Sequence, residues 1–186
     1  MKTKNFFLKN VATIVACFAV CTMMSCGIRI STAKIVFVHA DSLVINVDNY
    51  VNTKVETEGL IAHVCGVDRR KMKLMSDNGE VITVIPHDTT RFDYSLNRKR
   101  VRVYGLVKEE RLNEQYIVEK EEEKALLCHV DQRPCKDTSW AEAGVADSLS
   151  KKDTDRLRQK MEQQGKGYVS IVSIVCEKYE VIDANE

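Results

Sequence analysis

Aromatic residues are scarce in this sequence, at 6% of 186 residues, and it holds only two prolines and eight glycines. So few prolines and glycines exclude a long proline- or glycine-rich linker, and no internal repeat divides the chain. β-Branched residues are common instead, which favours strands over helices. We therefore expect a single, mainly β domain.

Diagnostic catalytic motifs are also missing. The sequence contains no Gly-x-Ser-x-Gly, no His-Glu-x-x-His, no phosphate-binding loop and no Cys-x-x-Cys. A large charge imbalance is absent too, because residues 26–186 carry 25 of the 28 basic residues against all 27 acidic ones. A net charge of −2 provides no general attraction to nucleic acid, so a nucleic-acid partner is disfavoured.

The first residues have the pattern of an export signal. Basic Lys2, Lys4 and Lys9 precede an apolar run over residues 11–20. That run of about ten residues is shorter than the roughly 20 that a membrane-spanning helix needs, which favours a cleaved signal. Ser25 before Cys26 matches the site at which bacterial lipoproteins are cleaved and acylated. We expect a signal over 1–25, a lipid anchor and spacer over 26–34 and one domain over 35–186. A plain secreted protein is the alternative.

Strand patterns fill the middle of the chain. Residues 53–65 predict a long strand in which Gly59 marks a bulge or sharp bend. Residues 72–74 and 81–85 predict a hairpin around Asp77-Asn78-Gly79, a sequence typical of a type I′ turn. Alternation over 101–107 predicts a fourth strand. After a charged turn over 108–113, residues 115–118 predict a fifth.

Three strands, a connection and two further strands are the order of an OB-fold barrel. The predicted fold is thus mainly β with minor α, an OB-fold-like five-stranded β-barrel over about 53–120 plus a C-terminal helix and strand. An acidic segment over 121–149 separates the barrel from a helix over 150–164, which Ser150 would begin and Gly165 end. The last strand is expected over 167–182 and joins or extends the barrel.

Two short motifs are familiar. His63-Val64-Cys65 after Gly59, and Gly165-Lys166-Gly167-Tyr168 before the last strand, are similar to segments of an uncharacterised group of bacterial OB-fold lipoproteins and periplasmic proteins. The resemblance covers residues 40–182. It implies the fold and a place in the cell envelope, and it implies no activity. The turn Gly66–Arg70 lacks the Gly-Gly found in several of these proteins.

Six residues are candidates for a transition-metal site, with zinc or copper as the ion. His63 and Cys65 share one face of the predicted strand, and imidazole with thiolate suits both metals. Further ligands would come from the remaining candidates, Cys128, His129, Cys135 and Cys176.

The same cysteines allow two other interpretations. An even number of cysteines after Cys26 in an oxidising compartment suggests disulfides, and the Cys128–Cys135 pair closes the shortest loop. Alternatively, the thiols are simply buried. A basic cluster, which comprises Arg69, Arg70, Lys71, Lys73, Arg98, Lys99, Arg100 and Arg102, would line an oligonucleotide face or meet anionic lipid headgroups.

The leading functional hypothesis is a membrane-anchored, non-enzymatic OB-fold binding module of the cell envelope, with a transition metal as a candidate cofactor. Its partners would be the lipid bilayer, through acylated Cys26, and an envelope protein or ligand. The second hypothesis is a structural or interaction lipoprotein with disulfide-bonded cysteines and no metal. The third is a thiol-dependent envelope enzyme, which the missing Cys-x-x-Cys disfavours.

Replacement of Cys26 tests the anchor. Cys26→Ser should move the protein from the membrane to the soluble fraction, because the acyl chains have no other attachment point. Cys17→Ser should leave it in the membrane, since cleavage at Cys17 would leave too short an apolar run. Fractionation and immunoblotting measure both, and continued membrane association of Cys26→Ser would refute the anchor.

Overall fold

A computed structural model describes residues 35–137, 139 and 143–182. The predicted signal, the spacer up to residue 34 and Cys26 lie outside the described residues. No helix of the described residues is long and apolar enough to cross a membrane.

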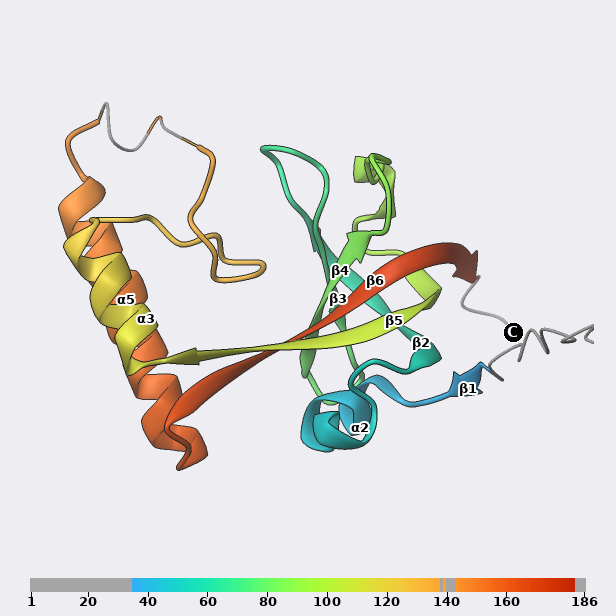
Figure 1. The fold of residues 1–186 in the computed structure, drawn as a ribbon. Helices are drawn as coiled ribbons and strands as arrows, with labels where there is room; N and C mark the ends of the chain where they lie inside the picture. Colours follow the sequence, from blue (N-terminus) through green and yellow to red (C-terminus); the bar gives the residue numbers. More distant parts are fainter. Residues whose placement is uncertain (1–34, 138, 140–142, 183–186) are drawn as a thin grey trace, which may run out of the picture. The chain divides into compact units, whose positions relative to one another are not determined.

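Five strands form a closed barrel (Figure 1). They are β2 (Lys54–Val64), β3 (Met72–Met75), β4 (Val81–Pro86), β5 (Arg100–Asn113) and β6 (Tyr168–Ile182). β2 pairs antiparallel with both β3 and β5, and β3 pairs antiparallel with β4. β6 closes the ring by pairing parallel with β4 and antiparallel with β5. This is the expected OB-fold-like barrel.

Smaller elements flank the barrel. The two-residue strand β1 (Val36–Phe37) pairs parallel with β2. The short helix α2 (Ala40–Ile45) follows it, and one-turn 3₁₀ helices span Val47–Asn49 and Tyr94–Leu96. Leu43 of α2 is fully buried and belongs to the same apolar core as the barrel interior.

Alternate residues of each strand form that core. Val101, Val103 and Val107 of β5 are fully buried, while Arg102, Tyr104 and Leu106 between them are half-buried. Ile82 and Val84 of β4 and Ile174 of β6 face the same interior. One face of each strand therefore supplies the barrel interior, as a period of two requires.

Gly59 and Gly105 lie where a neighbouring strand leaves no space for a side chain. A Cβ atom at Gly105 would lie 2.2 Å from the carbonyl oxygen of Val175 in β6, and one at Gly59 would lie 2.6 Å from that of Met75. The register between β5 and β6 shifts directly beside Gly105, after Tyr104. In β2 the irregularity lies between Ile61 and His63, so the bulge predicted at Gly59 is displaced, and Gly59 instead allows the close approach of the β3 backbone.

The fifth strand of the barrel is not where the sequence pattern placed it. The predicted turn over 108–113 is wrong, because β5 runs straight through it and pairs with β6 up to Asn113. Residues 115–118 lie in helix α3 (Glu114–Glu122). The side chain of Asn113 caps this helix by accepting a hydrogen bond from the Tyr116 amide at 3.0 Å. β6 therefore provides the fifth strand.

Two further local predictions need correction. Helix α5 (Ala146–Gln164) begins before Ser150, which is a buried residue inside the helix rather than its cap, because Ala146 and Leu149 are good helix formers and continue the helix upstream. Its end at Gly165 is confirmed by a left-handed φ of 61°. The hairpin at Asp77–Gly79 is also present, but only Gly79 has positive φ, whereas a type I′ turn needs two such residues.

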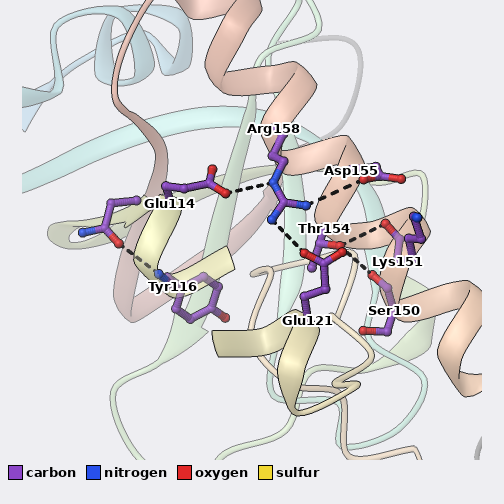
Figure 2. Close-up of polar contacts among 9 residues, drawn as sticks. Glu114, Tyr116, Glu121, Ser150, Lys151, Thr154, Asp155 and Arg158 are labelled. Carbon is purple, nitrogen blue, oxygen red and sulfur yellow. Dashed lines mark hydrogen bonds and ion pairs between the residues drawn. The ribbon is translucent and has the colours of Figure 1, made fainter. Parts of the chain in front are cut away.

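Helices α3 and α5 form a unit inserted between β5 and β6. Their shared apolar cluster comprises Leu112, Ile117, Leu127, Leu157 and Val169. Figure 2 shows that Arg158 of α5 reaches Glu114 and Glu121 of α3, with nitrogen–oxygen distances of 2.9 and 2.7 Å. One guanidinium group thus holds both ends of α3.

The close approach at Gly105 can be tested by Gly105→Ala. The added methyl group would collide with the β6 backbone, so we expect the free energy of unfolding to fall by about 3 kcal/mol. Gly167→Ala is the matched control, because no described heavy atom lies within 4 Å of its Cβ position, and its effect should stay within about 0.5 kcal/mol. Urea unfolding measures both; equal stabilities would argue against the barrel closure described above.

Candidate functional site

Residues 129–136 of the inserted chain, here called the covering segment, lie against the outer face of β3 and β4. The Thr83 hydroxyl of β4 donates a buried hydrogen bond of 2.8 Å to the carbonyl oxygen of Val130. The Lys71 ammonium lies 2.7 Å from the Asp131 carboxylate, and both side chains are less than a fifth exposed. In OB folds, the corresponding face and its adjoining loops bind oligonucleotides and oligosaccharides. Here the chain itself occupies the middle of that face.

A cleft of about 820 Å³ opens on one side of this covering segment. Its walls come from the β2–β3 turn, the strands β4, β5 and β6, and the inserted segment. The lining residues are Asp68, Arg70, Lys71, Thr83, Ile85, Pro86, Lys108, Glu109, Glu110, Asp131, Arg133, Pro134, Lys136, Ile171 and Ser173.

Most carboxylates in this large cleft already have a basic partner. Arg133 lies 2.8 Å from Glu110, and Glu109 lies 2.8 Å from Arg111. Burial alone would lower the pKa of Lys71, but the hydrogen bond and charge of Asp131 outweigh it and raise that pKa. Lys71 is therefore a fixed cation that holds the cleft wall in place.

The three cysteines near the cleft form one cluster. Buried Cys65 and Cys128 pack together with Val130, and half-buried Cys135 packs against them. Cys176 lies apart, in the core of the barrel. The structure thus separates Cys176 from the other predicted metal ligands.

All four cysteines of the described residues are free thiols, so the predicted Cys128–Cys135 disulfide is not formed. An isolated antiparallel β-bridge pairs Leu127 with Pro134 in a small hairpin. Cys128 and Cys135 therefore lie diagonally opposite each other on its two arms. Diagonal neighbours are roughly 7–8 Å apart, which is beyond the usual span of a disulfide.

Burial also governs the chemistry of the thiols. It raises the pKa of Cys128, where Lys71 compensates only in part, and it raises the pKa of Cys176 to about 11. A thiol with a raised pKa is a poor nucleophile at neutral pH. These two residues therefore do not resemble the activated cysteines of a thiol-dependent enzyme.

The two histidines of the predicted metal set meet outside the barrel. The rings of His63 and His129 lie 4.6 Å apart between centroids, and His63 Nε2 is buried without a hydrogen-bond partner among the described residues. Burial and then Lys73 lower the pKa of both. Within the described part of the chain, no three His, Cys, Asp or Glu side chains are arranged to hold a metal ion. The metal site stays a prediction.

The predicted basic cluster is dispersed over several partners. Arg69 stacks on Tyr94, and Arg70 donates to the carbonyl oxygen of Asp88. Arg100 pairs with Asp77 and Arg102 with Glu58, at 2.9 and 2.6 Å. The predicted cluster is therefore divided among separate partners, and Lys73 of the same set forms no ion pair with a carboxylate of the described residues.

Sequence reasoning missed most of the large cleft. Lys108, Glu110 and Arg133 were assigned to turns or to irregular chain, yet they line one cavity. No local signal could have shown that β5 extends so far, because residues 108–111 are all charged and the alternation of residues 101–107 does not continue into them. The comparisons add no further assignment, because the chain matches no protein-family model and no curated protein.

The role of the Lys71–Asp131 pair can be measured with Lys71→Met. The substitution leaves Asp131 buried without its cation, and we expect a loss of roughly 3 kcal/mol in the free energy of unfolding. Lys54→Met is the matched control, because Lys54 and Glu177 are also 2.7 Å apart but are each 44% exposed. That variant should lose no more than about 1 kcal/mol. Equal losses in chemical denaturation would show that the buried pair does not hold the cleft wall.

Proposed function

We propose that the protein is a lipid-anchored binding module of the bacterial cell envelope, and that its large cleft holds the ligand. The module acts by binding rather than by chemistry. The proposal combines the export and acylation pattern around Cys26 with the fold of residues 35–182.

The position of the large cleft carries this proposal. It lies beside β4, between the β2–β3 turn and the chain that connects β5 to β6. OB barrels use the corresponding strand and loops for binding. Its volume of about 820 Å³ also falls within the usual range of ligand sites.

The walls of the large cleft are held in place without a ligand. The Thr83–Val130 hydrogen bond and the Lys71–Asp131 ion pair tie the inserted segment to the barrel. A preformed cleft loses little conformational entropy when a ligand enters, which favours affinity.

The lining indicates a polar ligand with anionic groups. Arg70, Lys108 and Lys136 form no ion pair with a carboxylate in the described part of the chain, whereas Glu109 and Glu110 do pair with arginines. Ile85 and Ile171 add an apolar surface between the charges. A ligand with a short apolar chain that carries negatively charged groups would match both the unpaired cations and the apolar surface.

Site-specific photocrosslinking in cells tests the large cleft. A benzophenone amino acid in place of exposed Lys136, at the cleft rim, should yield an adduct with an envelope component, because a bound ligand lies within reach. The same amino acid in place of Lys152, exposed on α5, should yield none.

Ser173→Trp provides the second control, because it places a large side chain in the cleft. It should abolish the adduct at position 136 while leaving membrane fractionation unchanged. An adduct of equal strength from positions 136 and 152, or one that survives Ser173→Trp, would contradict ligand binding in this cleft.

A further inference from the structure

A second, smaller cleft of about 190 Å³ lies on the other side of the covering segment. It is bounded by the outer face of β3 and β4, by β6 and by α5. The lining residues are Lys73, Val81, Thr83, His129, Val130, Gln132, Arg156, Leu157, Lys160, Val169, Ser170, Ile171 and Val172.

The ionisable groups of this small cleft are all basic. Lys73, Arg156, Lys160 and His129 line it, and none of its lining residues within the described chain is a carboxylate. Arg156 and Lys160 are four residues apart on α5 and thus lie on one face of the helix. Half-buried Lys73 comes from β3, so a strand of the barrel and a helix of the insertion both contribute cations to one cavity.

Two of these cations lack a counter-charge. Neither Lys73 nor Lys160 forms an ion pair with a carboxylate of residues 35–137, 139 and 143–182, and only Arg156 does, with Asp153 at 2.9 Å. The large cleft differs, because carboxylates line it beside its cations, whereas no carboxylate lines the small cleft. The small cleft therefore concentrates positive charge that the protein itself does not balance.

The cations of this small cleft also repel one another. Because Lys73, Arg156 and Lys160 line one cavity, their like charges oppose each other, a cost that a bound anion would remove.

We propose that this small cleft is a binding site for a phosphate group. Lys73 would contact the phosphate from the barrel wall, and Arg156 and Lys160 from α5, with the guanidinium group offering two parallel donors. The cavity is smaller than the usual site for a whole metabolite, so it suits a phosphate or the phosphorylated end of a larger molecule. The two clefts share Thr83 and Ile171, but none of the three cations lines the large cleft, and the site does not depend on the ligand proposed there.

Phosphate binding is tested on the full-length protein in an uncharged detergent. Inorganic phosphate should raise the melting temperature well above the value in sodium chloride of equal ionic strength, because ligand binding to the folded state stabilises it. Titration calorimetry should give a saturable isotherm. An equal rise with chloride would mean charge screening only and would overturn the proposal.

Two variants assign the effect to the small cleft. Lys73→Met and Lys160→Met should each weaken phosphate binding about tenfold or more, as expected when a charged hydrogen bond is lost. Lys152→Met, an exposed lysine of α5 outside the cleft, should bind like the unchanged protein.

Without phosphate, Lys73→Met should be at least as stable as the unchanged protein, because it removes like-charge repulsion. Unchanged affinity in both cleft variants would refute the site. Since Lys160 is exposed, its variant keeps the test valid even if Lys73→Met folds poorly.

A comparison of two probes identifies the source of the phosphate. Tighter binding of glycerol phosphate than of inorganic phosphate would indicate the phosphorylated end of a larger molecule, and the reverse order would indicate the free ion. Binding of neither probe would overturn the proposal.

Discussion

The pairing of β6 with both β4 and β5 is the constraint on which the rest of the molecule depends. It closes the barrel, and it requires that β5 carry no side chain at Gly105, where the β6 backbone passes. A closed barrel leaves its strand edges paired and buries one face of each strand in a common core. The inserted helical unit begins at the end of β5 and ends at the start of β6. Because Asn113 pairs with Tyr168, the two strands also hold the ends of this unit together.

The inserted helical unit covers part of the outer face of the barrel and so shapes the clefts there. Arg158 and a small apolar cluster hold α3 against α5, and the chain between these helices lies across β3 and β4. An open OB face would offer one long groove. Here the covering segment leaves a large cleft lined by acidic and basic groups on one side and a small cleft without carboxylates on the other. The two clefts therefore differ in charge, although they share Thr83 and Ile171.

Local patterns in the sequence predicted the barrel well and its closure poorly. The alternation around Val103 and the stop at Gly165 depend on neighbouring residues, and both are present. The fifth strand depends on pairing between residues far apart in the chain, which a local pattern does not reveal, so residues 115–118 were mistaken for it. The candidate site shows the same limit. Cys65, Cys128 and Cys135 do meet, but Lys73 and Lys160 are 87 positions apart and only the fold brings them to one cavity.

The late position of β6 in the sequence has a consequence for how the chain folds. Fifty-four residues lie between the end of β5 and the start of β6, so the barrel cannot close until the inserted helices have been synthesised and folded back. Such distant pairing is slow, because the entropy of a long loop is lost before its contacts form. Until then, β4 and β5 each present an unpaired edge that can pair with another chain. Early association of α3 with α5 would shorten the effective loop and so assist the closure of the barrel.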